Sequence, residues 1–360
     1  MNANQTNPYQ HGLERCEANH APLTPLGFLR RAAEVYPDHI AVIDGATAKT
    51  WSEIERRCRR LASALARRGI GKNDTVSVLA PNSLAAYECH FGVPMAGAVL
   101  NAINVRLDAD TIAFILDHGE SKALLVDAEF APLAREALAR SDAAPLVIDI
   151  VGDDDDGSDN NNSGDDNDNG SDDNNGDNNA NDNNAHIGAL RYEDFLASGD
   201  GAHEWAWPAD EWDAISLNYT SGTTGDPKGV VYHHRGAYLN ALSNIVGWQM
   251  PHHPVYLWTL PMFHCNGWCF PWTLAALAGV NVCLRRVDAA SILDAIAAHG
   301  VTHFCGAPII MNMIINATPE ERREFSHSVE VMTAAAPPPA AVLAAMEENG
   351  FHMTHVYGLT

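Results

Sequence analysis

The spacing of apolar residues predicts an amphipathic helix near the start of the chain. Its apolar positions recur at helical intervals and share one face: Ile54, Cys58, Leu61 and Leu65. Thr50 followed by Glu53 has the spacing of a capping box, and Gly69 is suited to end a helix. We therefore predict a helix that begins after Thr50 and ends before Gly69.

Short apolar runs alternate with helical stretches farther along the first half. A β-branched run at 75–79 is followed by a turn at 81–83, a helical stretch from Leu84 and another apolar run at 123–126. Helices that alternate with short, nearly continuous apolar strands are typical of an α/β fold with buried sheets. We therefore predict that fold class.

The alternation continues in the second half of the chain. Asp288 is placed to cap a helix that runs through His299, and Gly300 is suited to end it. A strand is then expected at 301–305. A similar unit follows, with a strand at 329–332, a turn at 337–339 and a helix that ends near 349–350.

Composition changes this picture at one place, where a polar tract interrupts the alternation. Hydrophobic residues make up 46% of the 360 residues, enough for one large core or two ordinary ones. Residues 153–184 consist almost only of Asp, Asn, Gly and Ser and carry about half of the net charge of −24. Because the tract has no apolar residue larger than Ala, it cannot offset an ordering cost of roughly 1–2 kcal/mol per residue. We expect a disordered surface insertion over 152–186.

Calcium binding is the alternative role for this tract, since Asp and Asn offer oxygen ligands. The tract has neither a regular Gly-Gly-x-Gly-x-Asp repeat nor an EF-hand register, which favours a solvated low-complexity insertion. Without it the chain is only mildly acidic, which argues against a nucleic-acid partner.

Three features predict a cytoplasmic protein. No apolar run approaches the roughly 20 residues of a membrane span. The polar N-terminus, 1–20, does not resemble a secretory signal. The cysteines are odd in number and scattered through apparent helices and strands, which favours reduced thiols: Cys16, Cys58, Cys89, Cys265, Cys269, Cys283 and Cys305.

The most specific chemistry lies in 219–230, Tyr-Thr-Ser-Gly-Thr-Thr-Gly-Asp-Pro-Lys-Gly-Val. Alternating apolar residues predict a strand at 215–219 before it, and 230–232 predicts a second strand after it. The glycines permit close approach of a ligand, the hydroxyls and backbone N–H groups can donate hydrogen bonds, and Lys228 supplies a mobile positive charge. A polyphosphate needs these groups.

A Walker A loop is the obvious competitor for this segment. It requires a lysine directly after its last glycine, followed by Ser or Thr at the start of a helix. Here 226–227 separate Gly225 from Lys228, and Gly229 follows the lysine. A P-loop NTPase is therefore rejected, and a plain surface turn would not need so many hydroxyls beside a lysine.

The segment resembles the phosphate-binding signature of the acyl-adenylate-forming superfamily, the AMP-dependent synthetases and ligases. This superfamily includes acyl-CoA synthetases, peptide-synthetase adenylation domains and luciferases. The resemblance implies a large N-terminal domain of stacked β-sheets flanked by helices. It also implies that Thr220 and Lys228 serve catalysis and that the ATP phosphates are bound by Thr220, Ser221, Gly222, Thr223, Thr224, Gly225 and Lys228.

Residues 260–268 resemble the aromatic and histidine segment that borders the acyl pocket in that superfamily. The resemblance places His264, as a catalytic residue, near the acyl carboxylate and Trp268 in the pocket wall or gate. It adds Asn266, Gly267 and Gly306 to the pocket. Without the resemblance, His264 is better explained as a core histidine. The neighbouring cysteines are not expected to bind a metal, because no second ligand cluster has zinc-finger spacing.

Two more stretches resemble turns that contact the nucleotide. The small residues Ala334, Ala335 and Ala336, with Pro337, would avoid collision with a flat base. At 357–360, the resemblance implies that Tyr357 stacks on adenine, beside Gly358, and that Thr360 contacts the α-phosphate.

The runs at 22–37 and 264–268 look most like one subfamily, which contains short- and medium-chain fatty acyl-CoA synthetases, 3-(methylthio)propionyl-CoA ligases and plant acyl-activating enzymes. The implied reaction joins a short- or medium-chain carboxylic acid to coenzyme A through acyl-AMP, in fatty acid metabolism, with ATP and Mg²⁺. A homodimer is a further expectation.

Family members continue beyond the position of Thr360 with a Glu that helps to hold Mg²⁺, a ribose-binding Asp, a hinge and a small C-terminal lid domain with a catalytic lysine. We therefore expect an N-terminal arm at 1–20 and an incomplete AMP-binding domain at 21–360, which alone would not complete thioester formation. Two alternatives stay open. One is an inactive remnant that binds a nucleotide or nothing, and the other is an adenylation domain that loads a carrier protein.

Overall fold

Two mixed seven-stranded sheets form the framework of the protein in its computed structural model, which describes residues 9, 12–151, 187–220, 226–334 and 337–360. Sheet A has the order β14 (Phe351–His355), β13 (Val329–Thr333), β12 (His303–Cys305), β10 (Val255–Leu257), β11 (Val280–Val282), β1 (Ile40–Asp44), β2 (Thr47–Thr50). Sheet B has the order β7 (Leu190–Arg191), β6 (Leu146–Ile150), β5 (Ser121–Asp127), β3 (Thr75–Leu79), β4 (Val99–Ala102), β8 (Ala214–Tyr219), β9 (Gly229–His233). Neighbouring strands are parallel except at one edge of each sheet, where β1–β2 and β8–β9 are antiparallel.

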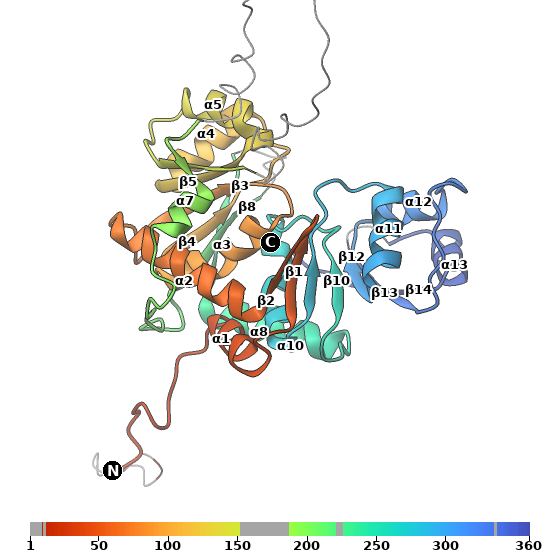
Figure 1. Cartoon of the computed structure of the whole chain (residues 1–360), viewed down its shortest axis with the longest axis horizontal. Helices are drawn as coiled ribbons and strands as arrows, with labels where there is room; N and C mark the ends of the chain where they lie inside the picture. The colour runs from red at the N-terminus through yellow and green to blue at the C-terminus, as the bar shows by residue number, and fades with distance from the viewer. Residues whose placement is uncertain (1–8, 10–11, 152–186, 221–225, 335–336) are drawn as a thin grey trace, which may run out of the picture.

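Helices pack between the two sheets and on both outer faces (Figure 1). The central layer contains α1 (Leu26–Val35), α2 (Trp51–Arg67), α3 (Leu84–Met95), α7 (Tyr192–Ala197), α8 (His234–Gly247) and α10 (Phe270–Leu277). The outer face of sheet B carries α4 (Ala109–His118), the 3-10 turn η1 (Ala128–Phe130) and α5 (Ala131–Leu138). The outer face of sheet A carries α11 (Ala289–His299), α12 (Pro308–Ile315) and α13 (Ala340–Glu348). The stacked α/β fold expected from the sequence is confirmed.

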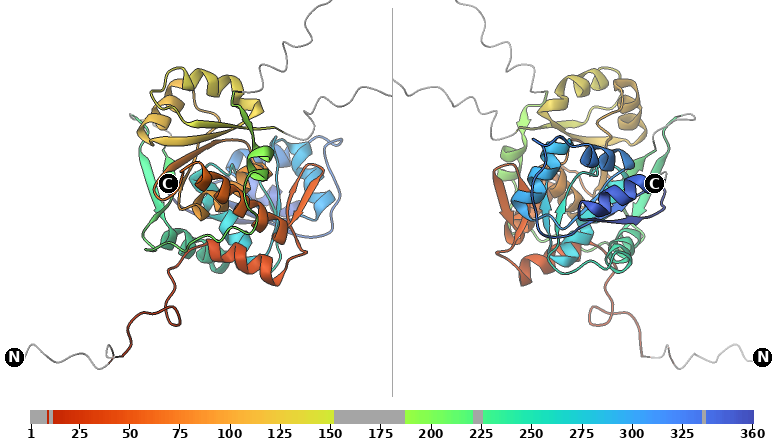
Figure 2. Two further views of the ribbon diagram at one scale, coloured as in Figure 1. Left: turned by 60° about the vertical axis from the view of Figure 1, so that its left-hand side comes forward. Right: turned by 90° about the vertical axis from the view of Figure 1, so that its right-hand side faces the viewer.

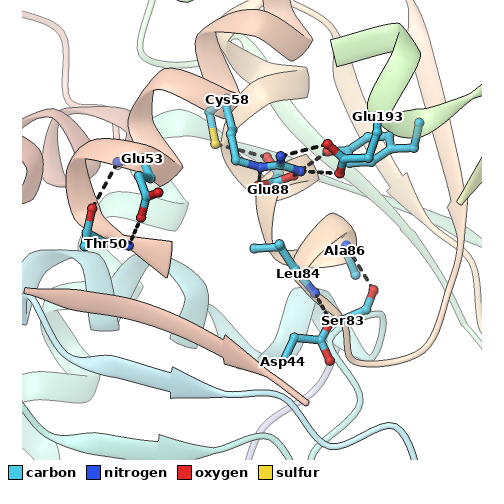
Figure 3. A network of polar contacts seen from close by, with 11 residues as sticks. Asp44, Thr50, Glu53, Cys58, Ser83, Leu84, Ala86, Glu88 and Glu193 are labelled. Atoms are coloured by element: carbon cyan, nitrogen blue, oxygen red, sulfur yellow. Dashed lines mark hydrogen bonds and ion pairs between the residues drawn. The ribbon is translucent and has the colours of Figure 1, made fainter. Parts of the chain in front are cut away.

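Local sequence signals explain where the best-predicted helices begin. The capping box forms at α2, where the Thr50 hydroxyl accepts from Glu53 N (3.3 Å) and the Glu53 carboxylate accepts from Thr50 N (2.8 Å; Figure 3). At α11, the Asp288 carboxylate accepts from Ser291 N (2.8 Å), and Gly300 ends the helix with φ +62°. These contacts satisfy backbone groups that a helix end leaves without partners.

The start of the strand predicted at 301–305 differs from the prediction by two residues. The strand expected at 301–305 begins only at His303, because Val301 N still donates to Ile296 O (3.3 Å) at the exit of α11. The strand at 75–79 is confirmed as β3, and the helix expected near 349–350 ends at Glu348.

The flanks of the acidic tract lie side by side in sheet B. β6 and β7 pair in parallel, and the Asp149 carboxylate accepts from Ile187 N (3.2 Å) and Gly188 N (2.9 Å). The expected insertion, 152–186, lies outside the described residues. At the N-terminus, residues 12–20 are exposed and run away from the body of the molecule (Figure 2). No helix in the described part of the chain is both long and apolar enough to cross a bilayer.

A buried ion pair ties the segment after the tract to the central layer. Arg57 of α2 binds both carboxylate oxygens of Glu88, whose side chain is fully buried in α3. The same guanidinium binds Glu193 of α7 (2.6 and 2.9 Å), and Tyr192 O–H donates to Glu88 (2.7 Å; Figure 3). Three helices from distant parts of the chain therefore share one set of charge-assisted hydrogen bonds.

Removing Arg57 should be strongly destabilising. Arg57→Met leaves the buried Glu88 charge unpaired, so we expect the free energy of unfolding to fall by about 3–5 kcal/mol, and by less in Arg57→Met/Glu88→Gln. Urea denaturation measures both. Arg30→Met, in the exposed Arg30–Glu34 pair, is the control and should cost below ~1 kcal/mol. Equal losses for Arg57→Met and Arg30→Met would contradict the assignment.

Candidate active site

The segment with phosphate-binding chemistry is the connection of a β-hairpin. β8 and β9 pair in antiparallel register up to Tyr219 and Gly229. Beyond this pair, Thr220 N donates to Lys228 O and Lys228 N donates to the Thr220 hydroxyl, both at 3.1 Å. These two bonds hold Thr220 and the exposed Lys228 together at the base of the loop. The predicted phosphate contacts in between lie outside the described residues: Ser221, Gly222, Thr223, Thr224 and Gly225.

Sheet A brings the other predicted segments to one edge. β12, β13 and β14 are parallel neighbours, so the residues that follow them leave the sheet at its carboxyl edge: Gly306, Ala334 and Tyr357. Gly306 N donates to Met332 O (3.0 Å) there. This edge is where open α/β sheets place their ligands. Pro337 is exposed at the same turn, whereas Ala335 and Ala336 lie outside the described residues.

The last residues of the chain return toward the histidine segment. Val356 N donates to Thr333 O (2.8 Å), and the Thr360 hydroxyl lies 3.3 Å from Cys265 Sγ. Tyr357 is 86% exposed and Gly358 is exposed beside it, so the phenol ring is open to a ligand from solvent. Thr360 is thus adjacent to the segment that carries His264.

The histidine segment contains an unusual left-handed turn. The five residues from Cys265 to Cys269 have φ of +45°, +41°, +51°, +53° and +65°, so the short element α9 (Cys265–Trp268) is left-handed. Each L-residue in this conformation costs roughly 1–2 kcal/mol. Gly267 is needed for a second reason, because a Cβ there would lie 2.7 Å from the Trp258 ring. The sequence motif did not predict this handedness.

An asparagine of sheet B, which the sequence did not single out as a site residue, contacts the left-handed turn. Asn218, in β8, accepts from Asn266 N (3.1 Å) and lies two residues before Thr220. The β8–β9 hairpin and the left-handed turn are therefore joined by a direct hydrogen bond. The available signal was an asparagine that, with Ser216, interrupts the apolar residues of the strand, where a buried polar side chain needs a partner.

The side chains of His264 and Cys265 are neutral at neutral pH. Surrounding protein desolvates the partly open His264 ring and lowers its pKa below 6.5, and the positive charge of Arg106 lowers it further. Burial raises the pKa of the Cys265 thiol, whose sulfur lies 4.0 Å from His264 Nε2. Since neither group is charged, the pair lacks the thiolate that cysteine nucleophiles require.

Metal binding finds no support in the described side chains. Within 12–151, 187–220, 226–334 and 337–360, no three His, Cys, Asp or Glu residues form a group that could hold an ion. All seven cysteines are described, and their thiols are free.

Comparison with known proteins identifies relatives over most of the chain. The family model described as AMP-binding enzyme matches residues 29–360. An acetate/butyrate–CoA ligase of Arabidopsis thaliana is 49% identical over 97% of this chain, and a trans-cinnamate:CoA ligase of Petunia hybrida is 46% identical over 97%. The chain spans 59% of the length of each.

A solved structure supports the fold independently of close sequence similarity. The N-terminal domain of FACL13 from Mycobacterium tuberculosis superimposes with a TM-score of 0.74, at 24% identity, over 94% of this chain and 76% of that one.

The relatives contradict the cytoplasmic location expected from the sequence. The Arabidopsis and petunia enzymes are peroxisomal by name, as are further Arabidopsis relatives. The prediction was wrong because reduced thiols and a missing secretory signal do not distinguish the cytosol from an organelle lumen that proteins enter by another route.

The protonation of His264 can be tested directly. We expect its ring to titrate below pH 6.5, and Arg106→Gln to raise this pKa while leaving it below 6.5, because burial is the larger cause. Ring ¹³C–¹H spectra against pH measure both. The folded state binds this proton less readily than the unfolded chain does. The contribution of His264 to the free energy of unfolding is therefore complete above pH 6.5, and it is lost as the pH falls from 6.5 through the lowered pKa. Titration above 6.5 in the parent protein would refute this electrostatic account.

Proposed function

Because the chain belongs to the AMP-binding enzyme family, we propose that it forms the nucleotide- and acid-binding part of an acid–CoA ligase. The observation that carries this proposal is the junction of the hairpin at Thr220 and Lys228 with the left-handed turn, through Asn218 and Asn266. That junction brings a polyphosphate-binding loop to the segment proposed to border the acid. ATP and coenzyme A are the proposed co-substrates.

The proposed acid is a short- or medium-chain carboxylic acid. The two relatives named above act by name on acetate or butyrate and on trans-cinnamate, which share a carboxylate and differ in the attached group. We infer that the common chemistry resides at the carboxylate end. The residues proposed to line that end are His264, Asn266, Gly267, Trp268 and Gly306.

The proposed reaction has two steps. In the first, a carboxylate oxygen bonds to the α-phosphorus of ATP, and the bond from that phosphorus to pyrophosphate breaks. In the second, the sulfur of coenzyme A bonds to the acyl carbon, AMP leaves with the bonding electrons, and the thiol proton passes to solvent. Both steps join bound reactants, so the main work of the protein is positioning and charge stabilisation.

Lys228 and Thr220 would act on the phosphates. The Lys228 side chain is exposed at the base of the hairpin loop. A single lysine–phosphate contact near 4 Å is worth roughly 4 kcal/mol at an effective dielectric of about 20, before the cost of desolvation is subtracted. Thr220 accepts from Lys228 N, which leaves its own O–H proton for a phosphate oxygen.

A neutral His264 suits the first step. An imidazolium beside the acid would attract the carboxylate charge that must attack phosphorus. A neutral ring, favoured by desolvation from the surrounding protein and by Arg106, orients the carboxylate through a hydrogen bond and leaves its charge available.

Mg²⁺, expected with ATP, would be held mainly by the phosphate oxygens of the nucleotide and would shield their charge during the first step. Such a site needs only one or two carboxylates from the protein.

Replacing Lys228 should slow adenylation without affecting the fold. In Lys228→Ala we expect ATP–pyrophosphate exchange to fall by roughly 10²-fold, the scale seen for one charge-stabilising donor, with an unchanged melting temperature because the side chain is exposed. Lys122→Ala removes an exposed lysine of β5 as the matched control and should leave exchange unchanged. Equal exchange rates for Lys228→Ala and the parent would remove Lys228 from the mechanism.

The activity itself is tested by the same exchange assay with straight-chain acids of two to ten carbons, run on this chain and on a longer gene product. Exchange with some of these acids, followed by thioester formation with coenzyme A in the longer product, supports the ligase. Exchange followed by transfer only to a carrier protein would support an adenylation domain. If neither protein catalyses exchange, the chain is an inactive remnant of the family.

A further inference from the structure

The backbone from Trp258 to Trp268 is held by three asparagine side chains that come from three different elements. We infer that Asn82, Asn218 and Asn244 are positioning residues that fix this segment for acid activation, an inference that rests on the function proposed above. None of the three was among the residues expected to contact a ligand. Their common feature is an amide group, which can donate and accept at the same time.

Asn82 holds the first part of the segment. It lies in the turn between β3 and α3 and is 7% exposed. Its Nδ2 donates to Trp258 O (2.6 Å) and Leu260 O (3.2 Å), and its Oδ1 accepts from Met262 N (2.7 Å). The Asn82 side chain, next to sheet B, thus satisfies three backbone groups of the segment that follows β10.

Asn218 and Asn244 hold the second part. The Asn218 side chain, 2% exposed, accepts from Asn266 N (3.1 Å) and donates to Ser216 Oγ (3.2 Å). Asn244, in α8, donates to Trp268 O (2.9 Å) and Thr273 Oγ1 (3.1 Å). The three asparagines therefore bracket His264 on both sides along the chain.

The bracketed turn is too costly to persist by itself. All five residues from Cys265 to Cys269 are left-handed, and the buried carboxamide of Asn266 has no partner for either polar atom within the described residues. Such strain survives only where surrounding contacts determine the conformation, and it concentrates at functional sites. A turn selected for stability alone would avoid both costs.

The chemistry of the contacts makes the asparagines distinguishable. Asn82 must donate and accept, so neither Asp nor Leu can replace it. Asn218 needs only an acceptor toward Asn266, because the Ser216 hydroxyl can reverse its role and donate. Asp at 218 should therefore retain the clamp, whereas the apolar Leu, of similar size, should lose it.

Amide hydrogen exchange tests the clamp without any ligand. In Asn218→Leu we expect the Asn266 amide to exchange at least about fivefold faster than in the parent, the factor for losing a net ~1 kcal/mol hydrogen bond. Met262, held by Asn82, should stay within about twofold, and Asn218→Asp should resemble the parent. Unchanged exchange at Asn266 in Asn218→Leu would overturn the clamp.

Ligand affinity tests whether the clamp serves the acid. By calorimetry, Asn218→Leu should weaken butyryl-sulfamoyl-adenosine, a stable acyl-AMP analogue, by about tenfold or more and AMP by less than about twofold, since only the analogue carries an acyl group near the turn. Asn218→Asp should keep most of the affinity for the analogue, whereas Asn82→Asp should lose it, because an aspartate cannot donate to Trp258 O and Leu260 O.

Asn101→Leu is the matched control for a purely structural role. Asn101 is fully buried in β4 and donates to Ser77 Oγ (2.9 Å) of β3, not to the turn. Asn101→Leu should lower the melting temperature without changing the ratio of the affinities for the analogue and for AMP. Equal weakening of AMP and analogue in Asn218→Leu would overturn the positioning role. A parent protein that binds neither compound would refute the proposed function, while the exchange experiment would still decide the clamp.

Discussion

Parallel strand direction is the constraint on which the candidate site depends. β10, β12, β13 and β14 run the same way in sheet A, so the segments that follow them must leave at one edge. Apolar side chains on both faces bury the sheet and make this arrangement stable. The 3.3 Å approach of Thr360 to Cys265 is a local consequence, since residues distant in sequence are delivered to the same place.

Directional polar contacts add to apolar packing where the two sheets meet at that edge. Asn82 and Asn218 belong to sheet B or its turns, yet their partners are backbone groups that follow β10 of sheet A. Apolar contacts tolerate sliding, whereas a hydrogen bond fixes both distance and angle. The proposed alignment of a carboxylate with a phosphorus atom would therefore gain from amide contacts. The Arg57–Glu88–Glu193 network plays a comparable part for α7, far from the chemistry.

Much of the fold was predictable because its signals are local. The capping box at Thr50 and the Asp288 cap act within three residues, and the β-branched run of β3 needs only its own composition. The late start of β12 was not predictable, because it depends on a hydrogen bond between Val301 and Ile296 at the helix exit. The glycines, hydroxyls and lysine of the β8–β9 loop led to the proposal that it binds phosphate. Asn218, one residue before the recognised segment, was missed because its partner is 48 residues away.

The sequence alone determined the alternation of helices and strands, the chemistry of the loop that ends at Lys228, and membership of a family of ligases. Each of these depends on neighbouring residues or on a contiguous motif. Only the tertiary structure decided that the histidine segment turns left-handed and that three distant asparagines hold it there. A side-chain amide pairs as well with one backbone group as with another. Its partner is therefore set by where the sheets place it, which no local pattern records.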